Sequence, residues 1–158
     1  MNNGKNFMVI AFMATLLITS CTPKKKPEPM IVETDHKTSM MEADRAFSKM
    51  SEESGLKNAF MNFIDNKGIL LRPNVVPLVG GNAVDYISQG ADTSYTMTWD
   101  PSGGMVARSG DLGYTYGVYS LRPKGRDTVL YGTYVSIWKR QEDGTWKFVL
   151  ETGNEGIE

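Results

Sequence analysis

The stretch YVSIWKRQEDGTWK, residues 134–147, reads as two β-strands joined by a tight turn. Aromatic and β-branched residues, which favour strands, lie on both sides of residues 142–144. Glu-Asp-Gly at these positions is typical of a hairpin, because Asp and Gly accept the backbone conformations that tight turns need. We therefore expect strands over residues 128–140 and 145–152, paired in an antiparallel hairpin.

The segments before this hairpin extend the strand pattern. Residues 112–121 alternate over a long strand, and residues 94–99 place Tyr, Met and Trp at every second position. A short strand is expected over residues 105–108, separated from the preceding one by a turn at DPSGG, residues 100–104. Successive strands joined by short turns predict an antiparallel sheet.

Helices are expected in the first half of the chain, where apolar residues recur at helical spacing. Ser39 and Glu42 fit a capping box that begins a first helix, and Gly55 ends it. A second helix is expected after Gly55, then a short strand over residues 69–72 and a short helix over residues 83–89. Helices followed by a run of strands predict an α+β fold, with the helices packed on one face of an antiparallel sheet.

Four segments of the chain together carry a family resemblance. They are ADRAFSKMSEESGLKNAFMNFI (43–64), GILLRP (68–73), WDPSGGMVARSGDLGYTYGVYSL (99–121) and GTYVSIWKRQEDGTWKFVLETGN (132–154). In this order they resemble the nuclear-transport-factor-2-like superfamily, and within it the SnoaL-like branch called the domain of unknown function 4440 family. The resemblance implies a cone, in which a strongly curved antiparallel sheet wraps around N-terminal helices and leaves a pocket at its open end. Related folds include ketosteroid isomerase, polyketide cyclases, scytalone dehydratase and members with no known activity, so the fold alone assigns no function.

The chain begins with a segment typical of bacterial export. Lys5 precedes an apolar run over residues 7–18. About a dozen apolar residues are too few to span a membrane comfortably but suit a signal peptide. Ile18-Thr19-Ser20-Cys21 then resembles the bacterial lipobox, which implies a diacylglyceryl group on the cysteine sulfur and cleavage just before that residue.

The lipobox divides the chain into three parts. We expect a lipoprotein signal peptide over residues 1–20, a lipidated Cys21 with a flexible tether over residues 21–36, and one domain over residues 37–158. A plain secretory signal with a leftover cysteine, or an uncleaved anchor, is the alternative. Lipidation implies attachment to a membrane of the bacterial cell envelope. Because Thr22 and not Asp follows Cys21, we expect the outer membrane if the cell is Gram-negative.

Composition argues against several classes of function. The chain carries 17 basic and 18 acidic residues, and this near-neutral balance does not favour a nucleic acid partner. His36 is the only histidine and lies beside the tether, so histidine catalysis is not expected. The carboxylates are scattered without the spacing of an acid/base pair or of a metal ligand set. We therefore assign no catalytic residue, no metal and no cofactor.

Aromatic residues of the strands and two charged residues are candidates for a ligand pocket. A curved sheet that closes over helices brings rings of adjacent strands together, either as ordinary core or as the wall of a small-molecule pocket. Arg72 ends an apolar strand, and a buried Arg needs a carboxylate from the protein or from a ligand. For Asp44, beside Arg45, the alternative is a solvated helix face or a local ion pair. The pocket candidates are Asp44, Arg72, Trp99, Tyr114, Tyr116, Tyr134 and Trp138.

These candidates support two hypotheses about function. The preferred one is an anchored binding or accessory module that holds a small apolar molecule, or pairs through its sheet as a homodimer. The alternative is an isomerase, cyclase or dehydratase that works by general acid/base catalysis. A cavity holding Asp44, Asp65 or Arg72 beside Tyr or Trp rings would favour the enzyme, whereas one filled by Met and Phe would not. Glu151 is expected on the opposite strand face from most of the aromatic side chains.

Overall fold

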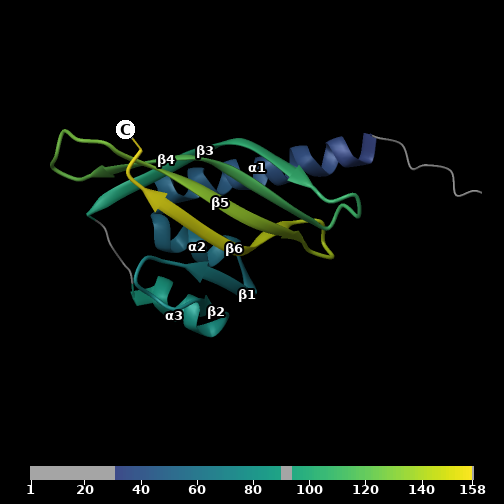
Figure 1. Cartoon of the computed structure of the whole chain (residues 1–158), viewed down its shortest axis with the longest axis horizontal. Helices are drawn as coiled ribbons and strands as arrows, with labels where there is room; N and C mark the ends of the chain where they lie inside the picture. Colours follow the sequence, from purple (N-terminus) through teal and green to yellow (C-terminus); the bar gives the residue numbers. More distant parts are fainter. Residues whose placement is uncertain (1–30, 90–93, 158) are drawn as a thin grey trace, which may run out of the picture.

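A computed structural model describes residues 31–89 and 94–157 of the chain (Figure 1). The expected signal peptide, Cys21 and the tether as far as residue 30 lie outside the described residues. Within the described part of the chain, no helix is both long enough and apolar enough to cross a membrane.

The described residues form three helices and one six-stranded sheet. The helices are α1 (Ile31–Ser54), α2 (Leu56–Phe63) and α3 (Gly81–Gln89). The strands are β1 (Ile64–Leu71), β2 (Leu78–Val79), β3 (Tyr95–Val106), β4 (Leu112–Pro123), β5 (Leu130–Arg140) and β6 (Trp146–Glu155). Their order in the sheet is β2-β1-β6-β5-β4-β3, and every neighbouring pair is antiparallel except β1 with β6. This is the expected α+β class, a curved, unclosed sheet with α1 and α2 against one face (Figure 1).

The first helix begins earlier than the capping pattern predicts. α1 starts at Ile31, inside the segment expected to be tether, so Ser39 lies within the helix and does not cap it. Ser39 Oγ instead donates to the carbonyl oxygen of His36 and accepts a hydrogen bond from Trp146 Nε1, both at 3.0 Å. The serine therefore ties the helix to β6.

The expected turn at DPSGG is a bulge. β3 runs without interruption through these residues, and its register with β4 shifts between Pro101 and Gly103. A bulge lets a strand absorb an extra residue while it bends. Pro101 is tolerated here because β3 is an edge strand, where a missing backbone N–H leaves no ladder position empty.

The core lies between α1, α2 and the inner face of the sheet. The Phe47 ring of α1 has its centroid 5.0 Å from that of Phe60, 4.7 Å from that of Trp99 and 5.5 Å from that of Phe148. Rings from two helices and two strands thus meet at one point. Each fully buried Phe contributes about 1.5–3 kcal/mol by removing apolar surface from water.

Glycines on the inner face of β4 let other elements approach the sheet. Gly113 lies opposite Trp138 of β5, and Gly117 lies opposite Tyr134. A Cβ atom at Gly117 would lie 2.6 Å from the carbonyl oxygen of Asp100 and 2.9 Å from the Tyr134 ring. Only glycine fits there without displacing its neighbours.

A second bulge, in β6, changes which residues face the interior. Phe148 pairs with Trp138, but Leu150 pairs with the residue just before Trp138, so Val149 is an extra residue in β6. A one-residue shift moves every later side chain to the other face of the strand. Glu151 therefore points into the interior, and the expectation that it lies on the opposite face from the strand's aromatic residues is wrong.

Candidate ligand-binding site

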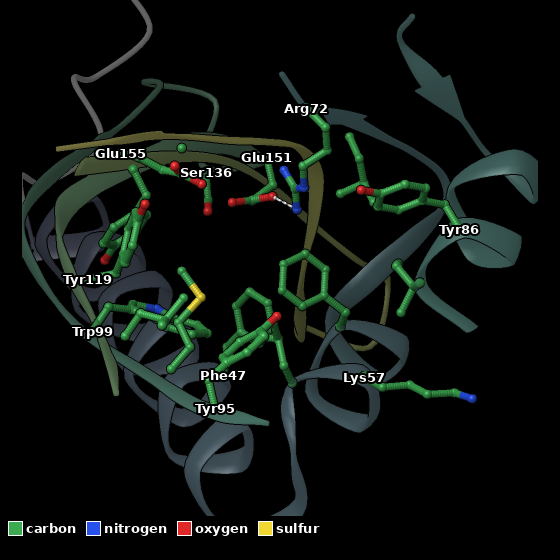
Figure 2. A pocket seen from close by; sticks show the side chains of 18 of the residues that line it. Phe47, Lys57, Arg72, Tyr86, Tyr95, Trp99, Tyr119, Ser136, Glu151 and Glu155 are labelled. Carbon is green, nitrogen blue, oxygen red and sulfur yellow. Dashed lines mark ion pairs between the residues drawn. The ribbon is translucent and has the colours of Figure 1, made fainter. Parts of the chain in front are cut away.

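A cavity of about 550 Å³ lies inside the curved sheet (Figure 2). Residues of all three helices and of β1, β3, β4, β5 and β6 line it. Most of the wall is apolar or aromatic, with a few charged and hydroxyl groups, as is usual for small-molecule sites. The aromatic side chains are Phe47, Phe60, Tyr86, Tyr95, Trp99, Tyr119 and Tyr134.

An ion pair between Arg72 and Glu151 lies on the cavity wall (Figure 2). Arg72 directly follows β1, and the parallel pairing of β1 with β6 brings it beside Glu151. Arg72 Nη2 is 2.5 Å from Glu151 Oε2, and Arg72 Nη1 donates to the carbonyl oxygen of Leu71 at 2.9 Å. The guanidinium carbon also lies 5.6 Å from the centre of the Phe60 ring, within cation–π range. Burial raises the pKa of Glu151, and the charge of Arg72 opposes that shift.

Asp44 is a buried carboxylate behind the cavity wall. It lies on α1 and has no exposed surface. Its Oδ1 accepts a hydrogen bond from Trp99 Nε1 at 2.7 Å, and its Oδ2 accepts one from the Tyr134 hydroxyl at 2.8 Å. Burial raises the pKa of Asp44, and hydrogen bonds from Thr115, Trp99 and Tyr134 oppose that shift. Burial and the Asp44 charge also raise the pKa of Tyr134, which keeps its hydroxyl protonated as a donor.

Several solved structures share this architecture at low sequence identity. A nuclear transport factor 2-like superfamily protein from Salmonella enterica has a TM-score of 0.60 at 10% identity, and the match covers 79% of this chain and 94% of that one. A nuclear transport factor 2-like protein of unknown function from Pseudomonas putida has a TM-score of 0.64 at 11% identity, covering 79% and 89%. A ketosteroid isomerase-like protein from Erwinia carotovora has a TM-score of 0.58 at 13% identity, covering 75% and 95%.

The chain has the nuclear transport factor 2-like fold. No family model matches the sequence, and no curated protein matches it closely. At the identities above, the likeness concerns the fold alone.

Within this nuclear transport factor 2-like fold, three of the predicted pocket residues come together. Arg72, directly after β1, lines the cavity together with Trp99 of β3 and Tyr134 of β5. Asp44 does not line it, but holds the Trp99 and Tyr134 side chains in place. Trp138 is fully buried in the core and is not part of the wall. Arg72 therefore shares the cavity with Tyr and Trp rings, which is the arrangement that was expected to favour the enzyme hypothesis.

Tyr114 and Tyr116 lie elsewhere than predicted. Both point away from the cavity on the outer face of β4, with 37% and 50% of their surface exposed. The inner positions around them belong to Gly113, Thr115 and Gly117, which alternate with the two tyrosines. The prediction chose the larger side chains as the inner row, whereas close packing against Tyr134 requires small ones there.

Two wall residues of importance were not predicted. Tyr119 has the same strand parity as Gly117, so a reading of the glycines as the inner row would have identified it. Glu151 had no such signal, because its orientation depends on the bulge at Val149. Nothing in the alternation of β6 marks where that extra residue is inserted.

The other titratable residues singled out from the sequence have structural roles. Asp65 is buried outside the cavity and accepts hydrogen bonds from the Lys67 backbone N–H at 2.9 Å and from Gln141 Nε2 at 3.3 Å. His36 packs in α1 near Gly110. In the described ranges, no cluster of three or more His, Cys, Asp or Glu residues could hold a metal ion.

Proposed function

We propose that the cavity binds a small, largely apolar molecule that carries one polar group. The observation that carries this proposal is the Arg72–Glu151 ion pair inside an aromatic cavity of about 550 Å³. Both the volume and the few polar groups among aromatic side chains are typical of ligand sites.

Folding alone gives little reason for this ion pair. The Arg72 and Glu151 side chains are only 22% and 12% exposed, and the loss of hydration of two buried charges offsets much of their attraction. Glu151 Oε2 is buried and, among the described residues, has no partner besides Arg72. A hydrogen-bond donor on a ligand would supply the missing contact.

Native mass spectrometry of the protein purified from its own cells tests this proposal. We expect one small molecule to copurify with the wild-type protein. The double variant Arg72→Met, Glu151→Met should lose it, while Tyr116→Ser, on the outer face of the sheet, should retain it. If the wild-type protein and both variants each show only the mass of their own ligand-free chain, the proposal is contradicted.

General acid/base catalysis is the second candidate function. It is favoured by Glu151, a carboxyl group whose pKa is raised by burial and which faces an apolar cavity. If Glu151 moves protons to and from carbon, a copurified ligand incubated in heavy water should gain deuterium. The Glu151→Gln variant should bind the ligand without exchange. A ligand that binds but never exchanges would leave binding as the function.

We also propose that Cys21 carries a lipid anchor, most consistent with the outer membrane of a Gram-negative cell. The support is the sequence Ile18-Thr19-Ser20-Cys21 after an apolar run. Cys21→Ser should move the protein from the membrane fraction to the soluble envelope fraction.

We likewise propose that the chain belongs to the SnoaL-like branch, as a member of the domain of unknown function 4440 family. The support for this finer placement is the sequence of residues 109–117 and 134–147.

The outer face of the sheet is proposed as a homodimer surface. Tyr116, Val118 and Tyr131 on β4 and β5 are 50%, 40% and 48% exposed. Contiguous apolar surface of this kind marks interaction sites on otherwise polar proteins. Because this face lies opposite the helices, two copies can pair through it without covering the cavity wall.

A further inference from the structure

Two cationic and two anionic residues line the cavity, but only the cation of Arg72 faces it, so the charges that face it leave a negative excess. Arg72 is matched by Glu151 at 2.5 Å. Lys57 borders the cavity, but its side chain points away, and its Nζ donates to the carbonyl oxygen of Ser88 at 2.8 Å (Figure 2). Glu155 lies on the same wall, and no cation of the described residues pairs with it.

Two of the ring side chains that line the cavity are electron-rich. Trp99 and Tyr134 both donate their polar hydrogens to the Asp44 carboxylate. A ring that donates to a carboxylate gains electron density on its faces, which strengthens its attraction for a cation. The two ring centroids lie 6.1 Å apart with 62° between their planes, so the rings form two sides of a corner.

Tyr119 forms a third side of this corner. It lies on β4, between β3 and β5, and it lines the cavity. Gly132 of β5 pairs with Tyr119 on one side and with Glu155 on the other, so Glu155 comes from the strand segment next to this ring. Burial raises the pKa of the Tyr119 hydroxyl, and the charges of Glu155 and Glu151 raise it further. An aromatic corner with carboxylates beside it matches the needs of an ammonium group.

Arg72 is a poor receptor for a ligand anion, because its guanidinium is already engaged. One nitrogen pairs with Glu151, another donates to the carbonyl oxygen of Leu71, and the Phe60 ring lies at 5.6 Å. A ligand carboxylate would have to compete with Glu151 and would then lie beside it, at a repulsive distance.

We propose that the ligand of this cavity is an organic cation, a protonated or quaternary amine attached to an apolar body. Its ammonium group lies in the corner formed by Trp99, Tyr119 and Tyr134, and its apolar body extends toward Phe47 and Phe60. The inference rests on the proposed small-molecule function and adds the charge of the ligand to it.

A matched series of ligands tests the charge. Octyltrimethylammonium, octanol and octanoate share one tail, and their binding can be followed by titration calorimetry below their micelle concentrations. We expect the cation to bind at least about fivefold more tightly than octanol, since a fully desolvated cation–π contact is worth roughly a thirtyfold factor and a partly exposed one less. Octanoate should bind most weakly.

A pair of charge variants tests the position of the cation. Glu155→Gln removes the rim carboxylate, and Glu142→Gln removes an equal charge from the exposed turn between β5 and β6. Glu155→Gln should weaken the cation about two- to fivefold and leave octanol unchanged, as expected for a partly exposed carboxylate. Glu142→Gln should change neither, and both exposed sites tolerate the substitution without unfolding.

The outcomes separate this inference from the function on which it rests. Octanol binding as tightly as the cation, or octanoate binding more tightly, would overturn the charge assignment while the binding function stands. Failure of all three probes to bind the folded protein would overturn both.

Discussion

At the scale of single residues, Asp44 organises the cavity wall without lining it. One carboxylate on α1 receives hydrogen bonds from side chains of β3 and β5, and so fixes two rings whose strands are not adjacent. Its chemistry was visible in the sequence only as an acid beside Arg45. Burial and partners come from the tertiary fold, which is why a solvated helix face or a local ion pair was the simpler interpretation of the sequence.

Replacing Asp44 by Asn should destabilise the fold. The amide group offers one acceptor oxygen where the carboxylate offers two, so either Trp99 or Tyr134 loses its partner inside the protein. A buried donor without a partner costs about 1–3 kcal/mol. Urea unfolding followed by tryptophan fluorescence measures the loss, and Glu42→Gln, exposed on the same helix, should fall within about 0.5 kcal/mol of wild type. Equal stability of the Asn variant and this control would refute the role of Asp44.

Glu151 should give the protein a measurable pH dependence of stability. Its pKa in the folded state is raised above the ordinary value of 4.5 by burial. Between these two values the folded protein binds more protons than the unfolded chain, so the contribution of Glu151 to stability is present at low pH and is lost as the pH rises through the folded pKa. The stability of wild type relative to Glu151→Gln should therefore increase as the pH falls toward 4.5. A difference that does not change with pH would contradict the raised pKa.

At the scale of elements, strand alternation was predictable but its phase was not. The strands β4, β5 and β6 lie close to the residues expected from sequence. In β4 the inner row contains the glycines, because rings of β5 and the end of β3 press against it, and this reverses the choice of Tyr114 and Tyr116. In β6 a single extra residue at Val149 turns Glu151 inward. Bulges depend on how neighbouring strands meet, so local pattern does not reveal them.

The tight approach at Gly117 yields a prediction for β4. Alanine there would place its methyl carbon 2.6 Å from the Asp100 carbonyl oxygen and 2.9 Å from the Tyr134 ring. Such overpacking costs about 1–3 kcal/mol, and the backbone atom cannot move aside as a side chain could. Thermal or urea unfolding should show the loss, whereas Gly81→Ala, with no heavy atom within 4 Å, should be neutral or slightly stabilising. If both variants unfold alike, the packing argument fails.

At the scale of the whole molecule, the two faces of the sheet differ in what they carry. The inner face carries the core and the cavity, and the outer face exposes apolar rings. The order of helices and strands was sufficient to predict the α+β class, because each segment carries its own helix or strand pattern, whereas the cone was predicted only from the family resemblance. The cavity contents depend on long-range pairing, so Arg72, Trp99 and Tyr134 could be predicted while their partner Glu151 could not.

The outer face gives a prediction about assembly. If two copies pair through it, Tyr116→Lys should convert a dimer into a monomer, because two like charges would meet in a buried interface of about 800 Å² per partner. Sedimentation velocity over a range of concentrations measures this. Asn82→Lys, which adds the same charge on exposed α3, should leave the dimer intact. A wild-type protein that sediments as a monomer at all concentrations would exclude the pairing.

The central claim is that the cavity holds a small molecule against the Arg72–Glu151 pair. A crystal structure of the protein isolated from its own cells without denaturation tests this most directly. We predict electron density for one small molecule among the rings of Trp99, Tyr119 and Tyr134, with its polar group beside Glu151. A cavity that has closed, with Phe60 and Arg72 filling its volume and no density for a ligand, would contradict the claim.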